Sequence, residues 1–169
     1  MEQNELYYYT FETVLGEMTA VEENGALVRL DISEKNLPAG AIFKETPLLK
    51  RTEEELREYL SGTRRSFDLP LNPKGTDFQR CVWQAMCAID YGATKSYGEL
   101  AADIGRPKAM RAVGGACHVN NIPIIIPCHR VIGADGSLTG YAGGIDKKIA
   151  LLKLEGTDKY ESLCSTNIG

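Results

Sequence analysis

The residues best suited to chemistry lie in one short segment, where a thiol, an imidazole and a guanidinium follow one another at Cys128, His129 and Arg130. A run of isoleucines between prolines precedes them, which predicts that Cys128 ends a buried segment. A free cysteine has a pKa of about 8.5, so a nucleophilic thiol needs nearby positive charge or a base. His129 and Arg130 could supply either, although adjacent side chains usually diverge, and a water between thiol and imidazole fits better than direct contact. A packed cysteine beside a capping histidine is the alternative.

A second chemical feature is a strip of positive charge. No acidic residue occurs between Asp103 and Asp135, and the bases there are Arg106, Lys108, Arg111 and Arg130. The whole chain has a formal net charge of −4. A local basic strip on an acidic protein can bind a polyanion without making the whole surface adhesive. The alternative for four charges alone is a solvated helix face.

The elements around these residues read as helices. Capping boxes at Thr76–Gln79 and Ser96–Glu99 predict two helix starts, the first helix ending by Gly92 and the second by Gly105. Pro107 suits the first position of a third helix, which we expect from residue 108 to about 117. Two short helices joined by a glycine turn form a helix-turn-helix, and the basic strip lies on the second of them. This combination favours DNA binding.

The first half of the chain is expected to be rich in β-structure. Strands are predicted at 6–9 and 15–21, and Asn24-Gly25 predicts a hairpin into an alternating strand from Val28 to Ile32. A capping box at Thr52–Glu55 predicts a helix that runs through Leu60, followed by a possible strand at 66–70. The segment 70–75, rich in proline and glycine, reads as a linker.

Composition excludes several classes of protein. The chain has 169 residues, of which 43% are apolar, and none of its apolar runs approaches the roughly 20 residues of a membrane span. An acidic N-terminus and five cysteines without a dense framework predict a reduced protein of the cytoplasm. Two histidines and the absence of a Cys-x2-Cys pair argue against a structural zinc site.

Three segments together carry a resemblance: Pro-Cys-His-Arg-Val at 127–131, Gly-Tyr-Ala-Gly-Gly at 140–144 and Arg-Ala-Val-Gly-Gly-Ala at 111–116. They resemble the methylated-DNA–protein-cysteine methyltransferases, also called O6-alkylguanine-DNA alkyltransferases, over about residues 76–156. The resemblance implies an α+β fold. Residues 1–75 would form a ribonuclease-H-like sheet domain with helices, and residues 76–169 a mainly helical, winged-helix-like domain that contains the helix-turn-helix.

The family's activity implies irreversible transfer of an alkyl group from O6-alkylguanine, and more weakly from O4-methylthymine, to Cys128. Because O6 lies at the base-pairing edge, the nucleotide must be flipped out of the duplex. The product is a thioether, so each chain is expected to act once. The expected partner is double-stranded DNA, without membrane or cofactor, and the protein is expected to be a prokaryotic, cytoplasmic monomer.

The resemblance also assigns roles. His129 would act on the thiol through a water and Glu155 would orient it, Asn120 would hold the segment before the cysteine, Tyr97 would hydrogen-bond the guanine, and Arg111 would fill the gap left in the duplex. The other expected DNA contacts are Tyr97, Gly98, Arg106, Ala109, Met110 and Gly114, and the expected pocket residues are Tyr141, Ala142, Gly143 and Val131. No metal ligand is expected.

Three other interpretations of these residues compete with alkyl transfer. An alkyltransferase-like protein that only binds lesions would lack the acceptor cysteine, whereas Cys128 is present. A sequence-specific regulator would need polar base-readers on its recognition helix, which here is mostly alanine, glycine and valine. A cysteine hydrolase would need a distant histidine, and His118 is the only histidine besides His129. The chain departs from the family pattern at Asn121, where proline is usual, and at Arg106 and Met110.

Overall fold

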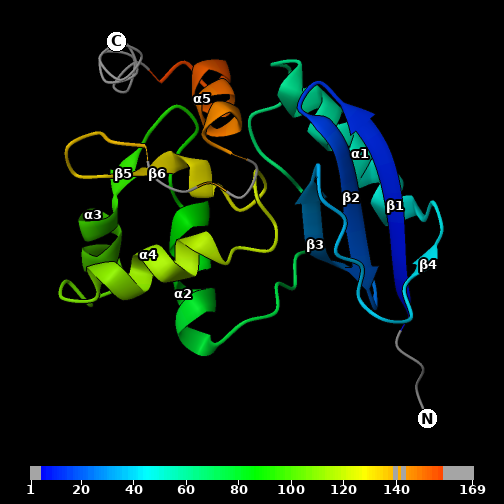
Figure 1. Ribbon diagram of the computed structural model, residues 1–169, viewed down its shortest axis with the longest axis horizontal. Helices are drawn as coiled ribbons and strands as arrows, with labels where there is room; N and C mark the ends of the chain where they lie inside the picture. The colour runs from blue at the N-terminus through cyan, green and yellow to red at the C-terminus, as the bar shows by residue number, and fades with distance from the viewer. Residues whose placement is uncertain (1–4, 139–140, 142–143, 158–169) are drawn as a thin grey trace. The chain divides into compact units, whose positions relative to one another are not determined.

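The computed structural model describes residues 5–138, 141 and 144–157, and the chain divides into two compact units, Met1–Lys74 and Gly75–Gly169 (Figure 1). The boundary falls in the segment rich in proline and glycine. Each unit is built around its own buried apolar residues.

The first unit is a four-stranded sheet with the order β3-β2-β1-β4. The strands are β1 (Leu6–Thr13), β2 (Gly16–Glu23), β3 (Ala26–Ile32) and β4 (Ile42–Phe43). β2 pairs antiparallel with both β1 and β3, and β4 runs parallel to β1. Asn24 and Gly25 have φ values of 52° and 82°, as a tight hairpin requires, so the predicted turn is confirmed.

The helix of this unit, α1 (Pro47–Leu60), packs on the sheet through Leu49, Leu56 and Tyr59. It begins six residues earlier than the capping box at Thr52 predicted, so that prediction is wrong. The hydroxyl of Thr46 accepts a hydrogen bond from the backbone of Leu49 at 3.0 Å, and proline follows it, which together make a stronger start. Thr52 lies inside the helix.

No strand forms at 66–70 within the described residues. Leu71 makes one isolated bridge with Leu27, and the backbone N–H of Asp68 donates to the buried carboxylate of Glu55 at 2.9 Å. A side chain of α1 therefore satisfies backbone that a neighbouring strand would otherwise bind.

The second unit contains α2 (Asp77–Cys87), β5 (Lys95–Ser96), α3 (Tyr97–Asp103), α4 (Met110–His118), a 3-10 turn η1 (Cys128–Arg130), β6 (Val131–Ile132) and α5 (Ile145–Leu154). Both predicted capping boxes, at Thr76 and Ser96, are present. In contrast to the prediction, α2 ends at Cys87 rather than near Gly92. A turn that closes on Arg106 occupies the residues before α4, so this helix begins at Met110 and not near Pro107.

Packing in this unit joins α2 to the helix pair. The buried indole of Trp83 on α2 donates to the carbonyl of Ala116 on α4 at 2.8 Å, and α3 packs against both helices. The short parallel pair β5–β6 ties the start of α3 to the residues that follow Cys128. The helix-turn-helix and the cysteine segment are thus parts of one small core.

The predicted α+β class is confirmed, with a sheet in the first unit and mainly helices in the second. Among the described residues, no helix is both long and apolar enough to cross a membrane.

Candidate active site

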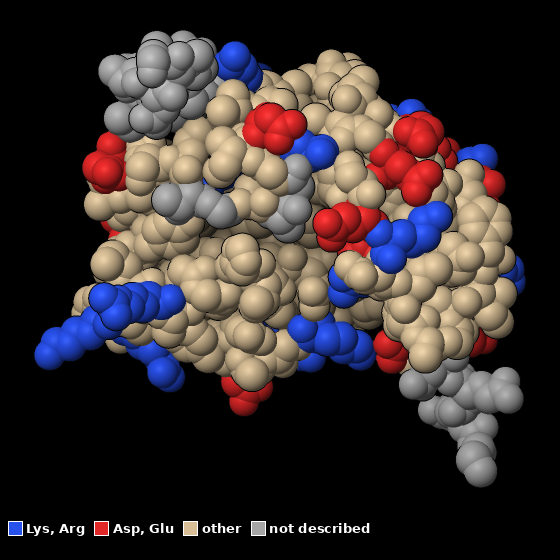
Figure 2. Space-filling model, viewed as in Figure 1, with Lys and Arg blue, Asp and Glu red and all other residues tan. Residues whose placement is uncertain are grey.

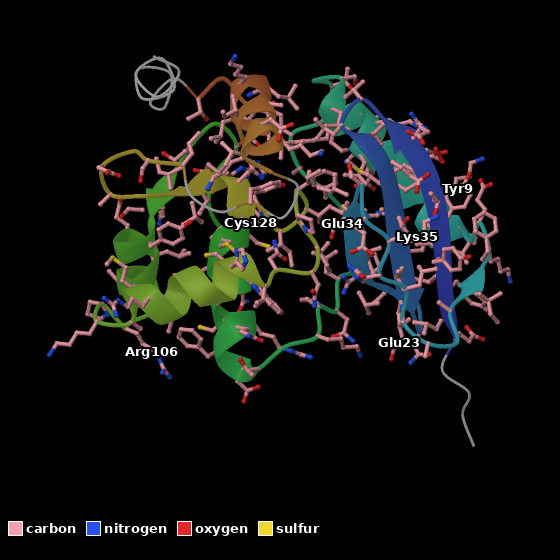
Figure 3. The ribbon with its side chains drawn as sticks, in the orientation of Figure 1. Tyr9, Glu23, Glu34, Lys35, Arg106 and Cys128 are labelled. Atoms are coloured by element: carbon pink, nitrogen blue, oxygen red, sulfur yellow. The ribbon has the colours of Figure 1, made fainter. Side chains whose placement is uncertain are left out.

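Cys128 opens the turn η1 directly after the isoleucine run (Figure 3). Ile122, Ile124 and Ile126 are almost fully buried, and the run bends back on itself because Ile126 N–H donates to the carbonyl of Ile122 at 2.9 Å. Ile124 adopts a φ of 71°, a conformation rare for a β-branched residue. The half-buried thiol therefore stands at the end of a tightly held buried segment, as the sequence predicted.

Asn120 holds this segment from inside. Its side-chain amide donates to the carbonyl of Ile126 at 2.9 Å, and its amide oxygen accepts from the N–H of Ile122 at 3.0 Å. Burial raises the pKa of the Cys128 thiol, and a hydrogen bond with the Asn120 side chain offsets part of this rise. One buried side chain thus fixes the backbone before the cysteine and favours its ionised form.

His129 and Arg130 both point toward Glu155, the residue that caps the end of α5. The distance from His129 Nε2 to Glu155 Oε2 is 2.8 Å. The Arg130 guanidinium donates to both carboxylate oxygens, at 2.8 and 2.9 Å, and to the carbonyl of Ile89 at 2.7 Å. All three side chains are buried. Paired donation of this kind fixes the plane of a carboxylate and so the orientation of the imidazole bound to it.

This arrangement corrects the interpretation of Arg130 as part of the basic strip. Its side chain is 9% exposed and its charge is matched by Glu155, so Arg130 is unavailable to a polyanion. The exposed strip consists of Arg106, Lys108 and Arg111.

The His129 imidazole is neutral at neutral pH. Burial lowers its pKa, and Glu155 opposes that effect without cancelling it. Because a carboxylate only accepts hydrogen bonds, the neutral ring must carry its proton on Nε2. Its other nitrogen, Nδ1, therefore holds the lone pair and can act as a base.

Lys148, which the sequence reasoning missed, is the cation of the thiol site. Its side chain is buried, and its ammonium donates to the carbonyl of Val131 at 2.8 Å. Burial lowers the pKa of Lys148, and electrostatic interaction with Cys128 and Cys117 offsets part of this drop. Lys148 in turn offsets part of the rise that burial causes in the pKa of Cys128. The positive charge near the sulfur thus comes from α5 rather than from residues 129 and 130.

A signal for Lys148 was present in the sequence. Lys148, Leu151, Leu152 and Glu155 recur at helical spacing, and they form the buried face of α5. Ile145, at the start of the same helix, is 38% exposed and does not belong to this face. Because this buried face contains both a lysine and a glutamate, Lys148 and Glu155, it indicates a functional role and not only apolar packing.

A cavity of about 700 Å³ opens beside the thiol. On one side it is lined by Tyr97 of α3 and by Met110, Arg111, Gly114, Cys117 and His118 of α4. Cys128 and the turn from Gly133 to Ser137 form the other side. The cavity is large enough for a purine base with a small substituent.

The surface of α4 beside this cavity is flat and open. A Cβ at Gly115 would meet no atom within 4 Å, and one at Gly114 would lie 3.8 Å from the Tyr97 ring. The small residues of α4 therefore leave its outer face free for close approach instead of packing it against another element. In Figure 2, lysine and arginine side chains project from the end of the helix pair where Figure 3 labels Arg106.

The remaining predicted site residues are spread around this centre. Arg106 lies in the turn before α4 with its guanidinium 5.6 Å from the Phe78 ring centre, and Ala109 caps α4. Gly98 lies in the first turn of α3, facing Met110. Val131 and Tyr141 are buried, and the structure does not place them among the described residues that line the cavity. Ala142 and Gly143 lie outside the described residues.

Comparison with known families gives two matches that together cover most of the chain. Residues 77–157 match the family described as 6-O-methylguanine DNA methyltransferase, DNA binding domain, and residues 6–73 match its ribonuclease-like domain. The predicted arrangement of a ribonuclease-like sheet followed by a helical DNA-binding region is thereby confirmed.

Individual relatives agree with this result. The constitutive methylated-DNA–protein-cysteine methyltransferase of Bacillus subtilis is 47% identical over 156 residues, which cover 88% of this chain and 94% of the relative. The protein of the same name from Methanosarcina barkeri is 47% identical over 153 residues, with coverages of 89% and 97%. The crystal structure of Mycobacterium tuberculosis OGT in complex with DNA superposes with a TM-score of 0.83 at 44% identity, covering 88% of this chain and 92% of that one.

Proposed function

The chain belongs to the methylated-DNA–protein-cysteine methyltransferase family, and we propose that it repairs O6-alkylguanine in double-stranded DNA by moving the alkyl group to the sulfur of Cys128. One observation carries this assignment: the thiol lies on a base-sized cavity, next to a buried lysine and a buried His–Glu pair. The sulfur is thus both accessible to a nucleobase and surrounded by groups that help it ionise.

The open face of α4 supports entry of a flipped nucleotide. Extruding a nucleotide costs a few kcal/mol, less when the base is mispaired, as alkylated guanine is. Arg111 lies on α4 at the edge of the cavity, where its planar guanidinium can occupy the space that the extruded base leaves. Small residues behind it allow the helix to approach a groove closely, and Arg106 and Lys108 lie nearby to bind phosphates.

The transfer itself is a direct displacement. The Cys128 proton passes through a bridging water to His129 Nδ1. Glu155 then stabilises the resulting imidazolium. The thiolate attacks the alkyl carbon, an S–C bond forms as the C–O6 bond breaks, and guanine leaves as an anion. Tyr97, which lines the cavity, is positioned to hydrogen-bond the base and stabilise that charge.

The thioether product explains why the protein acts once. Removing the methyl group would need a nucleophile to displace a thiolate from an unactivated carbon, and Cys128 has been used up as the acceptor. We therefore expect each chain to accept one alkyl group. We further propose that the protein acts more weakly on O4-methylthymine and that it is a cytoplasmic monomer.

The test is a mass measurement after mixing the protein with a duplex that contains O6-methylguanine. The chain should gain about 14 Da, the mass of a methylene, and the gain should map to the peptide that contains Cys128. Cys128→Ala should bind the duplex and gain nothing. A methyl group on Cys81, Cys87 or Cys117 instead of Cys128 would overturn the assignment.

A further inference from the structure

The turn after β6 presents a fixed carboxylate to the cavity. Gly133 N–H donates to the carbonyl of Ser137 at 2.8 Å, and Ser137 N–H donates to Asp135 Oδ1 at 3.0 Å. A Cβ at Gly133 would come too close to the Ser137 hydroxyl, so a larger residue there would force this side chain to move. Gly136 has a φ of 84°, which closes the turn. The carboxylate of Asp135 is therefore tied to the backbone of Ser137 at the edge of the cavity that contains Cys128.

The charge of Asp135 is present and unmatched. Hydrogen bonds from the side chain and backbone of Ser137 lower the pKa of its carboxyl group, so it is ionised at neutral pH. Asp135 forms no salt bridge with any residue that the structure describes, and it is the only acid among the described residues that line the cavity. Arg111 lines the same cavity, and the proposed function assigns it to the duplex. The buried cations nearby also have roles, Arg130 with Glu155 and Lys148 beside the thiol.

We propose that Asp135 determines specificity for the alkyl group and selects against O6 substituents that carry negative charge, such as carboxymethyl. The proposal rests on the function proposed above. Cys128 must attack in line with the C–O6 bond, so the rest of a longer substituent has to lie in the cavity that the turn at Asp135 lines. A carboxylate there lies in the same cavity as the negative charge of Asp135.

The size of the effect follows from Coulomb's law. Two like charges about 6–8 Å apart in a water-like medium repel enough to change a rate about two- to three-fold. Asp135 is exposed, so salt screens the repulsion and the discrimination should weaken as ionic strength rises. A substituent with positive charge should be favoured by a similar factor.

The experiment compares single-turnover rates on duplexes that differ only in the O6 substituent. Carbamoylmethyl is the neutral counterpart of carboxymethyl, with nearly the same shape, so the ratio of their rates isolates charge from size. Asp135→Asn keeps the acceptor for the Ser137 N–H and removes the charge. In this variant the preference for carbamoylmethyl over carboxymethyl should fall about two- to three-fold, while the preference of the wild type should shrink in high salt.

The matched control is Asp90→Asn, which removes an exposed acid of the same unit that does not line the cavity and should leave the ratio unchanged. As a second measurement, 2-aminoethyl should lose its advantage over neutral 2-hydroxyethyl in Asp135→Asn. An unchanged ratio in Asp135→Asn, or an equal shift in Asp90→Asn, overturns the role of Asp135. Transfer from O6-methylguanine, run in parallel, tests the proposed function separately.

Discussion

Replacing the buried lysine beside the thiol tests the electrostatic part of the site. Lys148→Gln removes the positive charge but retains hydrogen-bond donors for the carbonyl of Val131, which Lys148 now binds at 2.8 Å. A nearby opposite charge typically lowers a pKa by about 1–3 units, and each unit changes the ionised fraction tenfold. Since Lys148 lowers the pKa of Cys128, its loss should raise that pKa. Transfer at pH 7 should therefore slow by about ten-fold or more.

The direction in which the pH–rate profile moves distinguishes an electrostatic role of Lys148 from a packing role. Thiolate increases with pH, so the variant's rate profile should move to higher pH, and much of the lost rate should return in alkaline buffer. A loss of packing instead would lower the rate equally at every pH. The assay is single-turnover transfer from a methylated duplex over a pH range that extends well above the ordinary cysteine pKa of about 8.5, because burial raises the pKa of Cys128.

Control measurements make the result decisive. Lys153→Gln changes an exposed lysine on the same helix and should leave the pH profile in place. DNA affinity and thermal unfolding of Lys148→Gln show whether the fold persists. If Lys148→Gln folds, binds DNA and keeps the wild-type pH midpoint, Lys148 does not favour the thiolate and the reasoning is wrong.

Three further changes probe other contacts. Glu155→Gln leaves Arg130 charged, buried and without its carboxylate, so the free energy of unfolding in urea should fall by about 3–5 kcal/mol; a loss below 1 kcal/mol would contradict the buried ion pair. Asn120→Ala leaves the carbonyl of Ile126 and the N–H of Ile122 without their hydrogen-bond partner, which costs about 1–3 kcal/mol of stability each. It should slow transfer and leave DNA affinity close to wild type, and a normal transfer rate would show that the segment before Cys128 keeps its conformation without Asn120. Arg111→Ala should slow transfer from a duplex but not from the free base O6-methylguanine, and equal slowing on both would argue against a role in extrusion.

Local contacts were predicted well because their two partners lie within a few residues of each other in the sequence. The capping boxes at Thr76 and Ser96 join residues three apart, and the hairpin at Asn24-Gly25 depends on two adjacent residues that tolerate positive φ. Where two local signals compete, the pattern alone does not decide. Thr46-Pro47 and Thr52–Glu55 are both plausible starts for α1, and the earlier one prevailed because it buries Leu49 against the sheet.

The contacts that define the site are long-range, and they escaped reasoning from the residues alone. Glu155 is 26 residues from His129 and was assigned only through the family resemblance, while Lys148 was not assigned at all. β4 is two residues long and exists through its pairing with β1, so its own sequence carries almost no signal. In each case the partner comes from another element, and proximity along the chain gave no guide.

Arg130 shows how proximity along the chain misleads. It follows the cysteine by two residues and looked like the source of positive charge for the thiol, yet its guanidinium is bound to both oxygens of Glu155 and to the carbonyl of Ile89. Burial forces this pairing, because an ionised Glu155 without a partner would be strongly destabilising. With that carboxylate matched by Arg130, His129 stays neutral and retains the lone pair that a base requires. A second buried cation is then needed for the thiolate, and Lys148 from α5 fills that place.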